Sequence, residues 1–453
     1  MVVGRPLEPR ERLASQRRFN AFNFGNGVSY MCLGENLLVL FAARLDAPNA
    51  VVALLGAMLY IGYAMLPLGV RRTALRGAAD CQADFWIARN AAALLTASAA
   101  LVWRVSPPAS WCVLLLGSFL FYGCRAAGSV LSIPLLGDIS TEEEAPGVIG
   151  RTTAAFNVSG VATLAVIATI TRRHAGLGIL AGIIVFGALF GMASTLVLRG
   201  LRETGAIRDA ARAPLRRGMR EAMREPDLRR LSAAWFALNL ALILAMPLSM
   251  LALKRGCGLG DSEALLCACS QYIGGIAVSF ASGRLCRVLG PRRVLVATSV
   301  GCAAVPAAWM LFPAAGGAAL PCGLALFFWI GAVFYLVQNG ASSYFLLACP
   351  DKGGQVAGSV AVNLAAGVGA GVAGSAAGAW LISRAADLAP TLGAAAFAGA
   401  LGPFRLYFLL ILPAIALALV ASLRLRTKVY AYRETHGEDA LRRAIATAHH
   451  RPH

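Results

Sequence analysis

The chain has 453 residues, of which 58% are hydrophobic and only 14% charged, and its mean hydropathy is +0.67. This composition is too apolar for a soluble protein, and it excludes a disordered chain and a small disulfide scaffold. The formal charge of +19 would favour a nucleic acid partner in a soluble protein, but in a membrane protein basic residues mark one side of the membrane. We therefore expect an all-α polytopic membrane protein that lies in a lipid bilayer and binds no nucleic acid.

Apolar runs of about 20 residues, the length that crosses a bilayer, alternate with short charged or Gly/Pro-containing breaks. A basic arm at 1–19 precedes the first run, an Arg-rich loop at 199–230 divides the runs into two sets, and a tail at 425–453 follows the last. The predicted spans of the N-terminal half (20–198) are 20–43, 50–69, 84–103, 111–136, 150–171 and 175–198. Those of the C-terminal half (231–424) are 231–253, 263–285, 293–313, 320–347, 355–383 and 401–424. The pattern predicts twelve transmembrane helices in two six-helix halves.

The distribution of basic residues is consistent with this count. About 31 of the 41 Lys and Arg residues fall in the arm, the tail and the loops on their side, against about 7 in the opposite loops. Because basic loops remain in the cytoplasm, we predict that both termini are cytoplasmic and that the chain lies in the cell (inner or plasma) membrane. Three arginines fall inside spans instead: Arg89, Arg125 and Arg405.

The two halves also repeat each other weakly. SIPLLGDISTEEEAPGVIG follows the fourth span and leads to Asn157, and LLACPDKGGQVAG follows the tenth and leads to Asn363. In each segment a Pro/Asp turn ends an apolar run, closely spaced glycines follow, and an asparagine lies early in the next helix. We interpret the segments as equivalent loops of two pseudo-symmetric halves.

A motif of glycines and arginines follows the eighth span: Gly283-Arg-Leu-Cys-Arg287-Val-Leu-Gly290-Pro-Arg292-Arg293. It resembles the loop signature of the major facilitator superfamily, Gly-x-Leu-Ala-Asp-Arg-x-Gly-Arg-Arg/Lys, with Arg287 at the acidic position. The first-half copy, from Gly69 to Gly77, has its second glycine out of register.

The resemblance implies two six-helix halves, with helices 1, 4, 7 and 10 lining a central cavity. It also implies that the loop motif gates the cytoplasmic side, whereas ordinary positive-inside charge is the alternative reading of its arginines. The residues assigned to this gating loop are Gly283, Arg287, Gly290, Arg292 and Arg293.

The fourth span carries a polar stripe that includes Tyr122, Arg125 and Ser129 at helical spacing. Arg125 lies near mid-span, where its guanidinium suits a carboxylate or phosphate because it donates two parallel hydrogen bonds. The alternative is an arginine bonded to backbone carbonyls or held in a static ion pair. Drug/proton antiporters of the same family carry Arg-x-x-Gln-Gly in this helix, and Arg125-Ala-Ala-Gly128 is one residue short of it.

The first span is unusually polar. Asn26, Tyr30 and Asn36 fall on one broad helical arc, whereas Glu35 lies roughly opposite Asn26. Glu35 is the acidic residue placed well inside a span, and a desolvated carboxyl group can hold a proton near neutral pH. It is therefore the candidate for proton coupling, with a paired structural glutamate as the alternative.

The seventh and tenth spans add aromatic and amide side chains at helical spacing. These are Trp235 and Asn239 in the seventh span, and Tyr335, Gln338 and Asn339 in the tenth. Amides bind sugars, amino acids and amide-bearing drugs, but they also form hydrogen bonds between helices. We assign the set to the cavity and leave each single amide open between the two roles.

We predict a secondary active transporter that moves a small polar solute, anionic if Arg125 holds it, by alternating access with proton symport. The antiporter signature of the family, a Gly-Pro pair in helix 5, is absent from the fifth span, and this favours symport. A drug or metabolite exporter on the same fold is the alternative, and a receptor or scaffold without transport is a third. The sequence contains no nucleotide-binding loop, no His-Glu-x-x-His and no metal-type Cys spacing, so we expect no enzyme activity, cofactor or metal. We also expect a monomer.

Overall fold

The computed structural model describes residues 2–48, 51, 55, 58, 61–173, 176–313, 317–349 and 351–428. Within these residues, ten helical segments are long and apolar enough to cross a membrane. They coincide with the ten predicted spans from 84–103 to 401–424. The predicted span 50–69 lies partly outside the described residues, and the predicted span 20–43 is divided into two helices.

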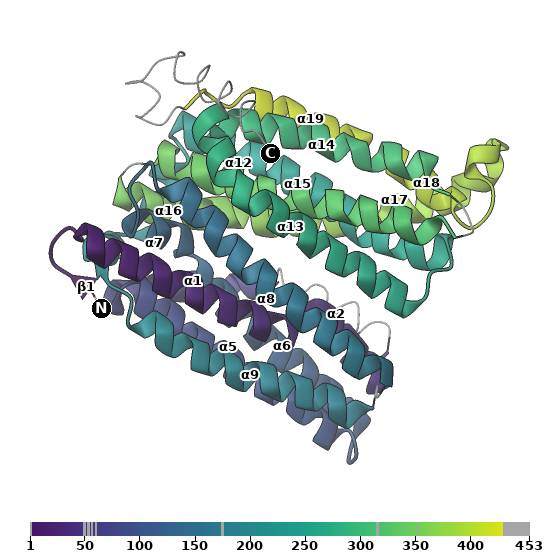
Figure 1. Cartoon of the computed structure of the whole chain (residues 1–453), viewed down its shortest axis with the longest axis horizontal. Helices are drawn as coiled ribbons and strands as arrows, with labels where there is room; N and C mark the ends of the chain where they lie inside the picture. Colours follow the sequence, from purple (N-terminus) through teal and green to yellow (C-terminus); the bar gives the residue numbers. More distant parts are fainter. Residues whose placement is uncertain are drawn as a thin grey trace, which may run out of the picture.

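The N-terminal half forms one bundle, which is coloured purple to blue-green in Figure 1. Its helices are α1 (Pro9–Met31), α2 (Glu35–Arg44), η1 (Gly62–Met65), α4 (Leu66–Arg76), α5 (Ala78–Val102), α6 (Pro107–Ser129), α7 (Ser132–Asp138), α8 (Ala145–Arg173) and α9 (Leu177–Arg199). The connection to the second half carries β2 (Glu203–Thr204), α10 (Ala206–Ala210) and α11 (Leu215–Ala222).

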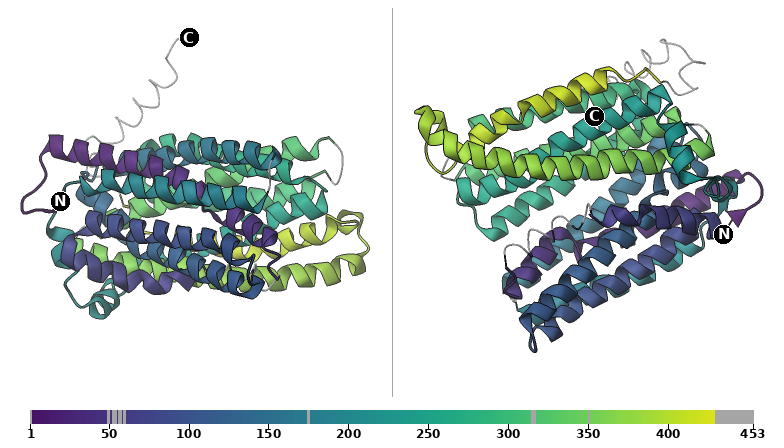
Figure 2. Two further views of the ribbon diagram at one scale, coloured as in Figure 1. Left: turned by 90° about the horizontal axis from the view of Figure 1, so that it is seen from below. Right: turned by 180° about the vertical axis from the view of Figure 1, so that it is seen from behind.

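The C-terminal half forms the second bundle, coloured green to yellow, and Figure 2 shows the two bundles side by side from two further directions. Its helices are α12 (Pro226–Leu251), η2 (Ala252–Gly256), α13 (Asp261–Leu289), α14 (Pro291–Leu311), α15 (Ala319–Ala348), α16 (Lys352–Val362), η3 (Asn363–Gly369), α17 (Ala370–Leu388), η4 (Ala389–Leu392), η5 (Ala395–Phe397), α18 (Gly402–Leu410) and α19 (Leu412–Leu423). The segments η2 and η3 are single π-helical stretches, and η3 interrupts the eleventh span between α16 and α17.

Two glycines make the same turn in the two halves. Gly77 separates α4 from α5 with φ 94°, and Gly290 separates α13 from α14 with φ 83°. Such positive φ angles suit glycine because it has no Cβ atom. Gly77 is out of register in the sequence motif, yet it occupies the turn that Gly290 occupies in the second half. The equivalence agrees with the predicted pseudo-symmetry of the halves.

Each half buries its own apolar core. In the C-terminal half, the Trp309 ring stacks on Phe408 at 5.1 Å, and its Nε1 donates a 3.0 Å hydrogen bond to Ser249. In the N-terminal half, Phe22 meets Trp86 edge to face at 5.8 Å. Both tryptophans are buried, so these contacts tie α14 to α18 and α12 in one bundle, and α1 to α5 in the other.

The start of the chain is joined to the connection between the halves. The short strand β1 (Val2–Val3) pairs in parallel with β2, and Ser15 of α1 exchanges hydrogen bonds with the backbone of Arg202. The described chain ends at Lys428, at the same end of the molecule. The Lys428 ammonium contacts Asp227, at the start of α12, at 2.9 Å. We call this end of the bundle the termini face, and the opposite end the far face.

The two halves approach each other most closely along α8 and α13, which lie side by side in Figure 1. A Cβ atom added to Gly150 would lie 2.3 Å from the Ser279 carbonyl oxygen, and one added to Gly283 would lie 2.8 Å from the Cα of Gly147. These glycines lie in the part of each helix nearer the termini face. Here the absence of side chains lets the two helix backbones come together.

Hydrogen bonds between the halves lie in the same region. Thr153 of α8 donates to the Asn339 side-chain oxygen of α15 at 3.0 Å, and Ser359 of α16 donates to the Val130 carbonyl at 2.5 Å. Both residue pairs lie within three helical turns of the termini face. The halves are therefore closed against each other on that side.

Candidate functional site

Arg125 lies one turn before the end of α6, near the middle of the membrane span Pro107–Asp138. Its guanidinium carbon lies 5.0 Å from the centroid of the Tyr30 ring on α1, an arrangement in which the face of the ring attracts the cation. The side chain is neither fully buried nor exposed, and it forms no hydrogen bond or ion pair with any residue that the structure describes. Arg125 is therefore a cation within the bundle that no described anion neutralises.

Tyrosines from both halves lie near this guanidinium. Arg125 interacts electrostatically with the phenol groups of Tyr30, Tyr63, Tyr122 and Tyr272. Tyr335 of α15 belongs to the same group, since it interacts with Tyr30, Tyr272 and Arg125. Tyr272 lies on α13 and Tyr335 on α15, so the group spans the boundary between the halves. Tyr30, Tyr122 and Tyr335 were predicted from their spacing, whereas Tyr63 and Tyr272 were not.

Asn157 is a polar residue of this region that the sequence singled out only as a marker of the internal repeat. It lies on α8, its side chain is fully buried, and its amide group is a hydrogen-bonding neighbour of the Tyr335 phenol group. A Cβ atom added to Gly275 would lie 2.3 Å from the Tyr335 ring and 3.0 Å from Asn157 Nδ2, so all three lie together. Burying an amide without hydrogen bonds is costly, so the polar atom of Asn157 that Tyr335 does not satisfy suits a ligand or water.

The amides of the seventh and tenth spans meet at the π-helical segment η3. Gln338 donates to the Asn239 side-chain oxygen at 3.1 Å, and Asn239 donates to the Ala366 carbonyl in η3 at 2.9 Å. These hydrogen bonds link helices, and the cavity role of the two amides stays a prediction. Trp235, one turn before Asn239, is buried, and its Nε1 has no acceptor among the described residues.

Asn26 lies in the interior of the N-terminal half. Its side-chain oxygen accepts hydrogen bonds from Trp86 Nε1 and Arg89, both at 2.9 Å. Arg89 is fully buried, donates also to Ser29 at 3.0 Å, and stacks against Trp86 and Phe121. The contacts of Asn26 are thus those of a packing residue.

The remaining predicted cavity residues make other contacts or lie outside the description. Asn339 is buried between α15, α8 and α13, where it also donates to Ser282 at 3.0 Å. Ser129 is exposed, and its hydroxyl lies 3.4 Å from the Ala126 carbonyl of its own helix. Residues Glu35 and Asn36 begin α2, but their side chains lie outside the described part of the structure.

The predicted gating loop lies at the termini face, where its members make different contacts. Gly283 packs against α8 and Gly290 makes the turn to α14. Arg287 and Arg293 are exposed, and Arg287 bonds to the Gly283 carbonyl of its own helix at 3.3 Å. Arg292 donates to the Leu423 carbonyl at 2.9 Å, which ties α14 to the end of α19.

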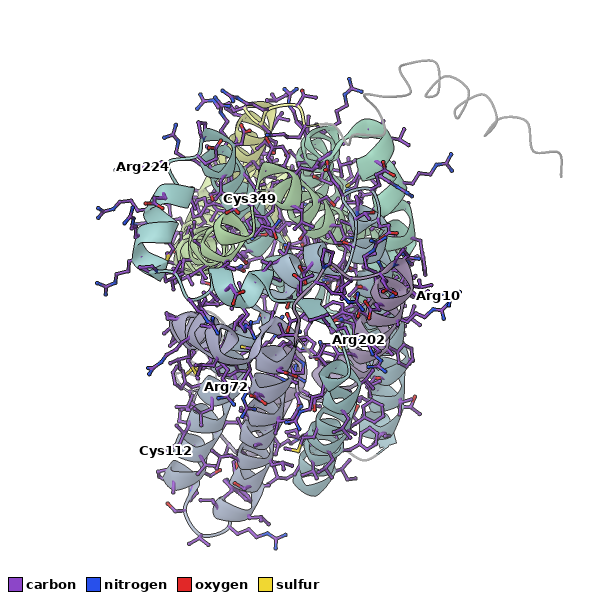
Figure 3. The ribbon with its side chains drawn as sticks, turned by 90° about the vertical axis from the view of Figure 1, so that its left-hand side faces the viewer. Arg10, Arg72, Cys112, Arg202, Arg224 and Cys349 are labelled. Atoms are coloured by element: carbon purple, nitrogen blue, oxygen red, sulfur yellow. The ribbon has the colours of Figure 1, made fainter. Side chains whose placement is uncertain are left out.

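The first half supplies an acidic partner that the sequence motif lacks. Asp84, on the second turn of α5, contacts Arg72 at 2.7 Å, Arg76 at 3.4 Å and Arg199 at 3.6 Å. Arg72 is labelled in Figure 3, which looks at the termini face. The cluster joins three helices at this face, α4, α5 and α9. Asp84 lies outside the Gly69 to Gly77 motif, so the motif by itself gave no sign of it.

Comparisons with known proteins agree with this architecture. A family model described as the Major Facilitator Superfamily matches residues 23–374. The Escherichia coli fucose:proton symporter FucP is similar in structure, with a TM-score of 0.67 and 12% identity over 92% of this chain and 100% of that one. The proton:xylose symporter XylE gives a TM-score of 0.65 at 10% identity, covering 92% of this chain and 95% of that chain.

A third similar structure is the human organic anion transporter MFSD10. Its TM-score is 0.57 at 17% identity, over 91% of this chain and 100% of that chain. No curated protein matches the chain by sequence. At these identities the solved structures show a shared fold, and the chemistry of the site rests on the residues described above.

Proposed function

The chain belongs to the major facilitator superfamily and has the fold of its secondary transporters, and on that premise we propose that it moves a small organic anion by alternating access. One observation carries the choice of an anion: Arg125 lies among tyrosines at mid-span with no described acidic partner. A charged side chain at membrane depth is costly unless a counter-charge or water accompanies it. A bound carboxylate or phosphate supplies that counter-charge through two parallel hydrogen bonds.

The tyrosines and amides around Arg125 give the proposed site its other contacts. Tyr30 and Tyr335 offer aromatic faces and hydroxyl groups from opposite halves, and the buried amide of Asn157 beside Tyr335 offers both a donor and an acceptor. A solute that contacts both halves binds differently as the halves rock, and such a difference is what couples binding to the conformational change. The proposed solute is therefore small and polar, with one anionic group and further hydroxyl or amide groups.

We place the termini face on the cytoplasmic side, in keeping with the positive-inside rule. The close contacts of Gly150 and Gly283 across the halves then lie on the cytoplasmic side, so the described conformation is closed towards the cytoplasm. Import with a coupled proton is the direction we favour, with Glu35 as the proposed proton carrier.

The anion assignment can be tested by thermal-shift screening of purified protein with metabolites, repeated with Arg125→Ala. We expect the stabilising compounds to be carboxylates or phosphates, and their stabilisation to disappear in the variant. Arg104→Ala is the matched control, because Arg104 is exposed in the loop between α5 and α6. If neutral compounds stabilise both Arg125→Ala and the unaltered protein equally, Arg125 does not hold the solute.

Transport and coupling need a second experiment on the compound found. In proteoliposomes, an imposed inward proton gradient should increase uptake, and Glu35→Gln should abolish that increase while leaving binding in place. Uptake that ignores the gradient would refute proton coupling alone. Binding without any flux would instead identify a receptor, and accumulation in inverted vesicles would identify an exporter.

A further inference from the structure

A pocket at the termini face lies between the end of α4 and the connection between the halves. Arg71 and Leu75 line it from α4, Arg212 lines it from the segment that joins α10 to α11, and Leu215 lines it from the start of α11. The pocket belongs neither to the tyrosine group around Arg125 nor to the Asp84 cluster. Two guanidinium groups thus share one pocket with apolar side chains.

Arg212 is held in place over the end of α4. Its Nε donates to the Ala74 carbonyl at 3.3 Å, and its Nη1 contacts Asp209 at 3.3 Å. Arg71 is exposed and has no hydrogen bond or ion pair to a residue that the structure describes. The pocket is therefore positively charged, since the carboxylate of Asp209 is also shared with Arg208 at 3.3 Å.

The apolar lining continues onto the outer surface of α4. Leu68 and Leu75, two helical turns apart, are 48% and 67% exposed, so this side of the helix offers apolar surface to lipid. Arg71 lies between them along the helix, and Arg76 follows Leu75 directly. Arginines thus alternate with exposed leucines towards the end of α4, as in a helix that lies at the boundary between acyl chains and headgroups.

The neighbouring helix α11 adds further positive charge. Leu215 and Met219 pack against a buried cluster shared by the N-terminal half and α16, and the arginines of this helix remain exposed. Arg217 is paired with Glu221 at 2.8 Å, whereas Arg216 has no ion pair within the described chain. In Figure 3 this segment lies at the edge of the molecule, next to the label of Arg224.

We propose that this pocket binds the phosphate of an anionic glycerophospholipid through Arg71 and Arg212, with the adjoining acyl chains lying along Leu75 and Leu215. Arginines recognise phosphate oxygens by charge-assisted hydrogen bonds. A soluble phosphate compound would satisfy the two arginines, but it would leave the apolar lining uncovered. The lipid satisfies both, and the exposed surface of α4 provides its path from the bilayer.

Native mass spectrometry of the full chain can measure the bound lipid directly. The probes are dioleoylphosphatidylglycerol, dioleoylphosphatidylcholine and inorganic phosphate. We expect retention of the phosphatidylglycerol over the phosphatidylcholine, reduced roughly fivefold by each of Arg71→Gln and Arg212→Gln. Arg71→Lys should retain most of the binding, because the charge remains.

Arg104→Gln is the matched control, since it removes an exposed arginine at the far face. Both pocket arginines are at the surface, so the variants should fold, and a melting curve without lipid verifies that. The proposal would be overturned if the variant with both Arg71→Gln and Arg212→Gln retained as much phosphatidylglycerol as the unaltered chain. It would also be overturned if Arg104→Gln lost as much of this lipid as the pocket variants. Occupancy by inorganic phosphate that competes with the lipid at the same arginines, without any need for acyl chains, would overturn the lipid assignment.

Discussion

Glu203 in the connection between the halves should make the stability of the protein depend on pH near neutrality. Its carboxylate is fully buried and accepts hydrogen bonds from the backbone N–H groups of Ala78 and Ala79, at 3.0 and 3.1 Å, at the start of α5. Burial raises the pKa of Glu203 from its ordinary value of 4.5 to about 7, although those two hydrogen bonds oppose the shift. The nearby carboxyl group of Asp138 adds to it.

The sign of the effect follows from where the proton binds more tightly. The folded state holds the proton of Glu203 up to about pH 7, whereas the unfolded chain releases it near pH 4.5, so acidification favours the folded state. The stabilisation is complete below about pH 4.5 and is lost as the pH rises through 7. Between about pH 8 and 5.5 the gain is about 2 kcal/mol, or roughly 4 to 8 °C in melting temperature for a half of this size.

Thermal unfolding of detergent-purified protein at these two pH values measures the effect. Glu203→Gln keeps the shape of the side chain and removes its titration, so the gain at the lower pH should fall by about 2 kcal/mol. Glu142→Gln is the matched control, because Glu142 is an exposed carboxyl residue of a loop at the same face.

Two results would contradict the reasoning. If Glu203→Gln shows the same rise in melting temperature on acidification as the unaltered protein, the pH dependence arises from other groups. If the unaltered protein becomes less stable on acidification while Glu203→Gln does not, the buried carboxylate is stabilised in its charged form, and the sign of the shift is wrong.

Three other substitutions test the fold around the site. Arg89→Ala should lower the free energy of unfolding by about 3 kcal/mol, because it leaves a cavity and unpaired buried acceptors. The loss should appear as a lower yield and a lower melting temperature, and an unchanged melting temperature would refute it. Gly150→Val should force α8 away from Ser279, at a cost of about 1–3 kcal/mol, and so open the termini face. Distances between spin labels across that face would report the opening, and unchanged distances would refute the close packing. Asp84→Asn should lower the free energy of unfolding by about 1 kcal/mol at low salt and by less at high salt, since its arginine partners are partly exposed. Melting curves at two salt concentrations measure this, and a loss independent of salt would show that ion pairing is not the cause.

The three arginines inside predicted spans show what residue types and spacing can predict about a functional site. All three were recognised as exceptions to the positive-inside pattern, because charge and span boundaries are properties of the sequence alone. Their roles differ in ways that the sequence did not indicate. Arg89 is bonded within the N-terminal half, Arg405 donates to the Phe312 and Ala396 carbonyls near the far face, and Arg125 has tyrosines around it. The spacing of α6 pointed to Arg125, but its neighbours from α13 and α15 depend on how the halves meet.

Asn26 and Asn157 also show what helical spacing leaves undecided. Asn26 was predicted to line the cavity, whereas Asn157 was not. Asn26 shares a helical arc with Tyr30, yet it bonds to Trp86 and Arg89, because α5 covers that side of α1. Asn157 lies beside Tyr335, since Gly275 lets α13 approach α8 without a side chain between them. Helical periodicity groups residues on one face, but it does not say which neighbouring helix covers that face.

The sequence by itself determined the number and approximate limits of the spans described here, the two halves and the turn glycine Gly290, because apolar length and backbone freedom are local properties. Only the tertiary structure decided which polar groups remain without partners at the centre. The neighbours of Arg125 and Asn157 come from helices distant in the chain, so which groups surround these two residues is a property of packing between the halves.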